Sequence, residues 1–256
     1  LKKQRLSEDL LKAEKSDIYR LYGELLTANL HQISHGLSSI ELFNYYNSET
    51  ITIPLDPRFT PTQNAQRYYK KYSKAKTAVT EKNIQLEETT ADISYLESVL
   101  DYIEKADTVE EIEELRLELI EGGYLRRRKN NFKPSRGKPA PYQYTTSDGF
   151  RVLVGRNNRE NDILTFKTAS GKDLWFHTKD IPGSHVILFT EGKGVTETAI
   201  FEAAALAAHH SKGRESENVP VDYTQVRHVK KPNGAKPGMV IFTDNKTVYV
   251  TPKVVT

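Results

Sequence analysis

Residues 60–105 read TPTQNAQRYYKKYSKAKTAVTEKNIQLEETTADISYLESVLDYIEK, and they set the architecture of the chain. Thr60 and Gln63 have the spacing of a capping box, and Pro61 occupies the first helical position, which proline favours. The helical pattern then continues to Lys105. With a rise of about 1.5 Å per residue, such a helix is about 65 Å long, more than a compact domain usually needs. The stretch therefore predicts one long helix that protrudes.

Apolar residues recur every seven positions along this stretch and again along residues 2–35. The longer stretch has Val79, Leu86, Ile93 and Leu100 with companions Leu96 and Ile103, and the earlier one has Leu11, Ile18 and Leu25 with Leu21 and Ala28. Seven-residue spacing is typical of a coiled-coil seam. We expect the two seams to face each other in a monomeric antiparallel hairpin, with oligomerisation through exposed seams as the alternative. A buried charge in the seam, as in Ile93→Asp, would then cost on the order of several kcal/mol.

Shorter elements flank the long helix. Residues 40–46 and 50–55 alternate apolar and polar side chains around residues 47–49, which predicts a small β-hairpin where the chain reverses. Thr108 and Glu111 form a second capping box for a helix to about Glu121, which Gly122 stops. The long helix also carries a basic aromatic cluster: Tyr68, Tyr69, Lys70, Lys71, Tyr72, Lys74 and Lys76. Such a cluster could contact RNA or an acidic protein surface. The alternative is a solvated face whose tyrosine rings are buried.

Charge divides the chain. Residues 1–125 hold 15 basic and 22 acidic side chains, and the remainder holds 22 basic and 12 acidic ones, a net charge of +10. We expect an arm over 1–125, a basic linker over 126–141 and a second domain over 142–256. Seven basic residues of the linker have no acidic neighbour: Arg126, Arg127, Arg128, Lys129, Lys133, Arg136 and Lys138. A phosphate backbone is the expected partner, and a flexible solubilising linker is the alternative. Lys230, Lys231 and Lys236 form a second basic group or an exposed turn.

Absent residue types exclude several classes of function. The chain has no cysteine, which excludes disulfides, cysteine-ligated zinc and cysteine nucleophiles. No apolar run approaches the roughly 18 residues that span a membrane. The chain opens Leu-Lys-Lys and its single methionine is Met239, so we expect a piece of a longer protein.

The second domain reads as α+β with a largely antiparallel sheet. Asn161 or Asp162 is expected to cap a short helix that ends at Thr168, and an alanine-rich helix is expected to pack on the sheet over 196–210. The expected strands are 150–155, 174–177, 185–189, 221–229, 239–243 and 247–251.

Candidate chemistry concentrates in residues 173–186, DLWFHTKDIPGSHV. The candidate ligand-facing residues are Trp175, His177, Lys179, Asp180, Gly183, Ser184 and His185. Strand periodicity places Trp175 and His177 on one face, and the Gly183–Ser184 amides could meet an anion, with Gly183 at positive φ. We expect the histidines to be structural or ligand-contacting. The alternative is a catalytic or metal site completed by His209 or His210, and we predict no catalytic residue, metal or cofactor.

Several motifs carry a resemblance to a known family. They are residues 173–186, 221–224, 231–238 and 250–252 near the end, and 22–30, 53–57 and 64–66 in the arm. The sequence resembles the middle coiled-coil region and C-terminal NFACT-R domain of the NFACT family, which includes RqcH, NEMF and fibronectin-binding protein A-like proteins, and in particular its Gram-positive members such as those of streptococci.

The resemblance implies a cytoplasmic ribosome-associated quality-control factor. It would bind tRNA and obstructed large ribosomal subunits and support alanine tailing of stalled chains, with peptide bonds forming at the ribosome itself. Because the same family is named for fibronectin binding, a cell-surface adhesin is the alternative. The family's N-terminal tRNA-binding domain has no counterpart in these residues.

Overall fold

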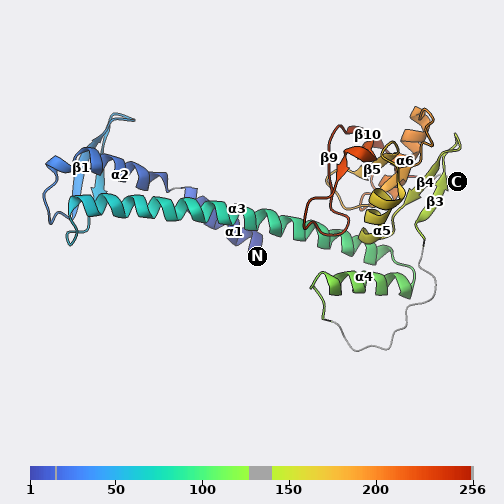
Figure 1. The fold of residues 1–256 in the computed structure, drawn as a ribbon, viewed down its shortest axis with the longest axis horizontal. Helices are drawn as coiled ribbons and strands as arrows, with labels where there is room; N and C mark the ends of the chain where they lie inside the picture. The colour runs from blue at the N-terminus through green and yellow to red at the C-terminus, as the bar shows by residue number, and fades with distance from the viewer. Residues whose placement is uncertain (15, 127–139, 255–256) are drawn as a thin grey trace. The chain divides into compact units, whose positions relative to one another are not determined.

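A computed structural model describes residues 1–14, 16–126 and 140–254 (Figure 1). The chain forms two compact units, Leu1–Ala91 and Asp92–Thr256, and helix α3 (Pro61–Lys105) contributes to both. The domain boundaries at residues 125 and 141, which we inferred from charge and composition, stay a prediction. Mixed helix and antiparallel sheet confirm the α+β class.

The first unit begins with two helices over the residues whose seven-residue spacing predicted a coiled-coil seam. Helix α1 (Lys2–Glu14) and helix α2 (Asp17–Ala28) are separate, and a short 3₁₀ turn follows at Leu30–Gln32. At the end of α2, Asn29 Nδ2 donates to the Leu25 carbonyl at 2.8 Å and Thr27 Oγ1 donates to the Gly23 carbonyl at 2.7 Å. Such side-chain bonds compete with continued helix, so α2 ends at Ala28, before the end of the heptad pattern at about His35.

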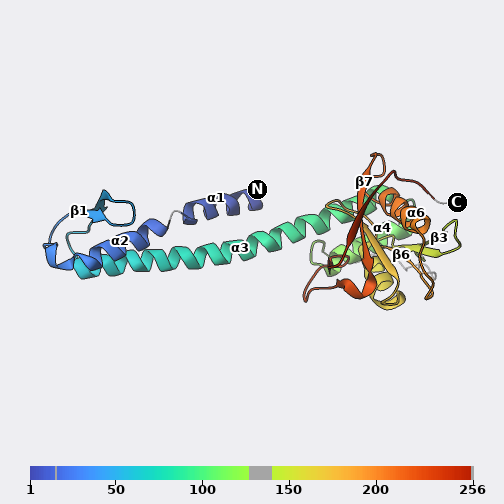
Figure 2. The same ribbon diagram turned by 90° about the horizontal axis from the view of Figure 1, so that it is seen from above.

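The predicted hairpin is present as β1 (Ser39–Asn44) and β2 (Glu49–Pro54), which pair antiparallel. Helix α2 runs beside the first turns of α3 (Figure 2), and the hairpin packs with both in one apolar core. Its buried members are Leu25, Leu26, Ile33, Leu42, Ile53, Ala65 and Tyr68. Of the earlier heptad, Leu25 is buried and Ile18 is exposed, and the side chain of Leu11 lies outside the described part.

Both predicted capping boxes are confirmed. The Gln63 amide N–H donates to Thr60 Oγ1 at 3.2 Å, and the Thr60 N–H donates to Gln63 Oε1 at 2.9 Å. Thr108 and Glu111 form the same pair of bonds at the start of helix α4 (Val109–Glu121). Because these signals depend only on neighbouring residues, the helix starts could be predicted without the tertiary structure.

Within the second unit, the predicted heptad positions of α3 do not form a buried intramolecular seam, and oligomerisation through them stays untested. Ile93, Leu100 and Ile103 are 39%, 58% and 39% exposed. The buried positions are instead Tyr95, Val99 and Tyr102, and this i, i+4, i+7 spacing is that of a helix face packed on a globular core. Since Ile93 is not in a closed seam, the expected large cost of Ile93→Asp no longer follows.

A six-stranded antiparallel sheet forms the centre of the second unit, in the order β10-β7-β5-β6-β4-β3. The strands are β3 (Tyr142–Thr145), β4 (Arg151–Val154), β5 (Leu174–Thr178), β6 (Val186–Leu188), β7 (Val219–Gln225) and β10 (Lys246–Val250). A separate pair consists of β8 (Val229–Lys230) and β9 (Ile241–Phe242). Strand β3 was not predicted from the sequence. The predicted strand over 221–229 is interrupted by a 3₁₀ turn at Val226–His228.

The two faces of this sheet bury different cores. Helix α6 (Glu197–His209) buries alanines against the face that contains Phe176, Val186 and Leu188. The opposite face holds Trp175, Ile187 and Leu164. There, helix α5 (Asn158–Ile163) continues as a π-helical turn at Leu164–Thr168. Asn157 caps α5 through the Glu160 N–H, so the predicted cap at Asn161 or Asp162 is wrong.

Candidate functional site

Strand β5 brings Trp175 and His177 to one face, as the two-residue period predicts. Their rings stack with centroids 5.8 Å apart and planes 8° apart. His185, which precedes the neighbouring strand β6, meets Trp175 edge-on at 5.2 Å and His177 edge-on at 5.7 Å. The three rings form one aromatic group, in which the sequence correctly predicted the pair Trp175 and His177 and the structure adds His185.

Hydrogen bonds fix the protonation of both histidines. His185 Nε2 lies 3.1 Å from the Gly238 carbonyl, which only accepts, so Nε2 carries the hydrogen, and Nδ1 accepts from the Thr165 hydroxyl at 2.8 Å. By the same reasoning His177 Nε2 donates to the Gly183 carbonyl at 3.3 Å. Burial lowers the pKa of His177 and lowers that of His185 well below its ordinary value of 6.5. Both rings are therefore neutral at physiological pH.

A cavity of about 350 Å³ opens beside this aromatic group. Helix α3 supplies one wall, the segment around the Pro182–Gly183 turn a second, and the segment that ends in β9 a third. Its lining residues are Ser94, Glu97, Ser98, Asn158, Trp175, His177, Asp180, Ile181, Pro182, Gly183, His185, Gly238, Met239, Val240 and Phe242. Five of the seven predicted ligand-facing residues line this cavity, and Lys179 and Ser184 do not.

The structure corrects the account of Gly183. Its φ is not positive, and the residue in the left-handed region is Asp180, with φ of 58°. A Cβ at Gly183 would lie 2.6 Å from Thr178 Oγ1 and 3.0 Å from Ser211 Cβ, so space is what requires glycine. The Ser184 N–H donates to the His210 carbonyl at 3.1 Å. Of the two amides predicted to meet an anion, that of Ser184 therefore already has an acceptor, and an anion contact at Gly183 stays a prediction.

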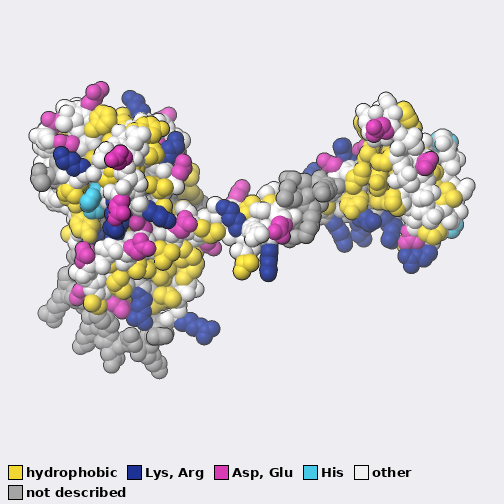
Figure 3. Space-filling model, turned by 180° about the vertical axis from the view of Figure 1, so that it is seen from behind, with side chains coloured by type: hydrophobic (Ala, Val, Ile, Leu, Met, Phe, Trp, Pro, Cys, Tyr) yellow, Lys and Arg dark blue, Asp and Glu magenta, His cyan; other side chains and the backbone are white. Residues whose placement is uncertain are grey.

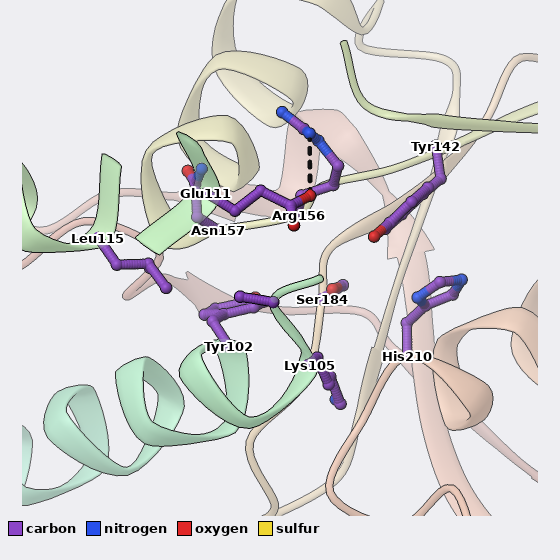
Figure 4. Close-up of a pocket in the computed structure, with 10 residues that line it drawn as sticks. Tyr102, Lys105, Glu111, Leu115, Tyr142, Arg156, Asn157, Ser184 and His210 are labelled. Carbon is purple, nitrogen blue, oxygen red and sulfur yellow. Dashed lines mark hydrogen bonds and ion pairs between the residues drawn. The ribbon is translucent and has the colours of Figure 1, made fainter. Parts of the chain in front are cut away.

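Ser184 instead lines a smaller cavity of about 40 Å³ behind the turn (Figure 4). Arg156 pairs there with Glu111 at 3.2 Å and with Glu160 at 2.6 Å. His210, which burial holds neutral with a pKa of about 3, faces the same space. A cavity of this size has room for roughly a few water molecules. We interpret it as a polar junction that joins α4 to the sheet.

The predicted basic residues divide into two groups. Lys230 is exposed, whereas Lys231 pairs with Asp162, and Lys236 lies 3.7 Å from Asp92 and over the Tyr124 ring at 4.8 Å. Internal partners therefore compete with any phosphate at Lys231 and Lys236. Arg126 is exposed, and the remaining linker candidates lie outside the described residues: Arg127, Arg128, Lys129, Lys133, Arg136 and Lys138.

In the basic aromatic cluster of the first unit, the structure shows buried tyrosine packing, whereas contact with RNA or an acidic protein stays a prediction. Tyr68 is buried and donates to the Pro54 carbonyl at 2.5 Å. Lys71 lies over the rings of Tyr68 and Tyr19 at 5.1 and 5.5 Å. Lys and Arg side chains of this unit gather on one side in Figure 3. The tyrosines thus form the packed base of a basic surface.

Within the parts of the chain that the structure describes, no three His, Cys, Asp or Glu side chains are grouped as metal ligands. No described helix is long and apolar enough to cross a membrane.

Sequence reasoning missed the other walls of the larger cavity. Glu97 and Ser98 come from α3, Asn158 from α5, and Met239 and Phe242 from the segment near β9. No local pattern marks Glu97 or Ser98, since each is one more polar residue on a long helix. The Lys236-Pro237-Gly238 turn was the available signal for the third wall: Gly238 has φ of 75°, and a Cβ there would meet Asn158 Oδ1 at 2.4 Å.

The fold and cavity define a class: an antiparallel sheet domain with an aromatic, histidine-containing cavity, which follows a helical unit in a chain whose long helix α3 belongs to both units. Comparison with known sequences gives the family. Residues 1–138 match the NFACT N-terminal and middle domains, and residues 140–244 match the NFACT protein RNA binding domain. The chain belongs to the NFACT family, as its motifs predicted.

Curated relatives share the name "Rqc2 homolog RqcH". The Bacillus subtilis protein is 45% identical over 253 residues, covering 97% of this chain and 44% of the relative. The Streptococcus suis protein is 46% identical over 246 residues, covering 96% of this chain and 44% of the relative. The chain therefore spans less than half the length of these relatives.

A solved structure is also similar. It is the C-terminal part of the fibronectin/fibrinogen-binding protein from Streptococcus suis, with a TM-score of 0.77 and 38% identity, covering 98% of this chain and 87% of that one.

Proposed function

We propose that this chain is the RNA-binding middle and C-terminal part of a ribosome-associated quality-control factor. In the cytoplasm it binds tRNA and obstructed large ribosomal subunits, and it supports alanine tailing of stalled nascent chains. The observation that carries the proposal is the match of residues 140–244 to the family's RNA-binding domain. Relatives named RqcH that cover nearly the whole chain give it further support.

The proposed role is binding, without a chemical step by this chain. His177 and His185 are held neutral, and both ring nitrogens of His185 are engaged in hydrogen bonds. A general base needs a free acceptor nitrogen within reach of its proton, and His185 has none. Peptide bonds in alanine tailing would form at the ribosome's own centre.

Charge supports RNA as the partner. The residues from 126 onward carry a net charge of +10, and phosphate contacts by such residues make affinity fall with salt, by slightly less than one unit of log-log slope per contact. The test titrates tRNA at two salt concentrations against the unmodified chain and a variant with seven neutralised positions. These are Arg126, Arg127, Arg128, Lys129, Lys133, Arg136 and Lys138. A reduced slope is expected, and unchanged tRNA binding would remove the linker from the interface.

Ribosome binding is tested separately, by co-sedimentation of the chain with large ribosomal subunits at physiological salt. Co-sedimentation with obstructed subunits above that with empty ones is the expected result. If the chain sediments with neither obstructed nor empty large subunits, the ribosomal part of the proposal is contradicted.

Fibronectin binding at the cell surface is the second candidate, favoured by the name of the similar solved structure. The titration above is repeated with fibronectin. Tight binding with weak salt dependence, together with no tRNA binding, would make fibronectin the primary partner.

A further inference from the structure

The cavity beside Trp175 has apolar and aromatic walls of a size that suits a flat ring. His177, Met239 and Phe242 are partly exposed, and with Ile181 and Pro182 they form its accessible surface. Its volume of about 350 Å³ lies at the lower end of small-ligand cavities, roughly 300–1,000 Å³. Unpaired RNA bases stack on such aromatic side chains, histidine among them.

Two carboxylates, which are acceptors, lie among the polar groups that line this cavity. Glu97 and Asp180 are both exposed, and neither forms a hydrogen bond or ion pair within the described part of the chain. Ser94 and Ser98 add hydroxyl groups on the helical wall, of which Ser98 Oγ already bonds to the Tyr95 carbonyl and to Asn158, and among the described residues no lysine or arginine lines the cavity. A phosphate is unfavourable beside two unpaired carboxylates, whereas a base edge that presents N–H donors is favourable.

The two histidines do not offset the negative charge of these carboxylates. Burial keeps His177 and His185 neutral, so they add no positive charge to compensate Glu97 and Asp180. The indole N–H of Trp175 is itself buried without a hydrogen-bond partner among the residues that the structure describes. Buried donors of this kind are rare in native proteins, and because this one has no exposed surface, it takes no part in the contacts with a ligand.

We propose that this cavity binds one unstacked RNA base, with guanine preferred. The base packs on the accessible aromatic surface that His177 and Phe242 contribute, and its adjacent N1–H and N2–H donors bind the carboxylate of Glu97 or Asp180. Among the four bases, guanine alone offers two adjacent donors to a carboxylate, while adenine and cytosine offer an exocyclic amine and uracil a single N–H. The inference rests on the proposed RNA-binding function and adds a site and a base preference to it.

The chain offers its own spectroscopic reporter, because Trp175 is its single tryptophan and lines the cavity. Tryptophan fluorescence of the whole 256-residue chain is followed as short RNAs are added. The RNAs are oligouridines, either unmodified or with one central guanosine, adenosine or cytidine. Quenching at the lowest concentration is expected for the guanosine RNA, with at least about a fivefold advantage over oligouridine.

Three variants separate the cavity from other surfaces. Glu97→Gln and Asp180→Asn remove the charge and keep the shape, and asparagine tolerates the left-handed backbone that Asp180 adopts. At least one of them should lose about fivefold or more of its affinity for the guanosine RNA and little for oligouridine. Glu104→Gln, an exposed position on the same helix outside the cavity, should behave as the unmodified chain. Circular dichroism checks that each variant is folded.

Failure of the base site and failure of the proposed RNA-binding function give different results in these titrations. Equal affinity for all four RNAs, unchanged by Glu97→Gln and Asp180→Asn, would overturn the base site and leave RNA binding elsewhere on the chain. Absence of binding to these RNAs and to tRNA would overturn the proposed function as well. A short arginine-containing peptide is titrated in parallel, because a guanidinium also pairs with carboxylates and stacks on rings. If the peptide binds more tightly than any RNA and depends on Glu97 and Asp180, the cavity is a protein-binding site.

Discussion

Gly183 is required by its surroundings, because a Cβ there would overlap Thr178 Oγ1 and contact Ser211. Gly183→Ala should therefore lower the free energy of unfolding by about 1–3 kcal/mol, the usual cost of overpacking. Gly194→Ala is the matched control, since a Cβ at Gly194 meets nothing within 4 Å. Denaturant unfolding of both variants checks the prediction, and equal effects would contradict the steric explanation.

His185 makes the stability of the second unit depend on pH. Burial, and secondly the neighbouring His177, lower the pKa of His185 well below 6.5 in the folded state. The unfolded chain therefore takes up the proton first, and the free energy of unfolding decreases as the pH falls below about 6.5.

His185→Gln tests this dependence, because glutamine keeps an N–H donor for the Gly238 carbonyl and does not titrate. The variant should be less stable than the unmodified chain at neutral pH. The difference between their free energies of unfolding should decrease as the pH falls below about 6.5. His35→Gln, at an exposed position, serves as control. Thermal unfolding is measured across this range, and parallel curves for the unmodified chain and His185→Gln would rule out His185 as the cause.

At the scale of the element, two adjacent residues of α3 separate its buried face from its exposed one. Val99 is 2% exposed and Leu100 is 58% exposed. Val99→Asp should cost roughly 3 kcal/mol or more, because it buries an unpaired charge, whereas Leu100→Asp should change the stability by about 0.5 kcal/mol or less. Chemical denaturation of the two variants provides the measurement. A larger effect at Leu100 would restore the coiled-coil seam that the heptad pattern predicted.

The elements themselves were well predicted where their signals are local. Capping residues gave the starts of α3 and α4, and alternation gave the hairpin of β1 and β2. Strand β3 was missed because its four residues, Tyr142–Thr145, follow the proline-rich linker and pair only with β4. A pairing of that kind is stabilised by its partner strand more than by its own residues.

The whole molecule contains separate cores, since the core of the first unit and the two cores of the second unit share no residue. Unfolding should therefore depart from a single transition. Circular dichroism follows helices of both units, whereas Trp175 fluorescence reports only on the second. Leu26→Ala, at a fully buried position of the first unit, should cost about 2–5 kcal/mol there. It should shift part of the dichroism transition and leave the fluorescence transition in place. A shift of both together would mean that the chain unfolds as one unit.

The amino-acid sequence by itself determined the long helix, the capped starts, the α+β class and the strand that places Trp175 beside His177. These features depend on periodicity and on contacts between residues that are close together in the sequence. Only the tertiary structure decided which face of α3 is buried, because that face is selected by α4 and the sheet. It also brought Glu97, Asp180 and Phe242 to one cavity. No spacing rule relates three such distant positions, and their meeting follows from how the helix and the β8–β9 segment pack on the sheet.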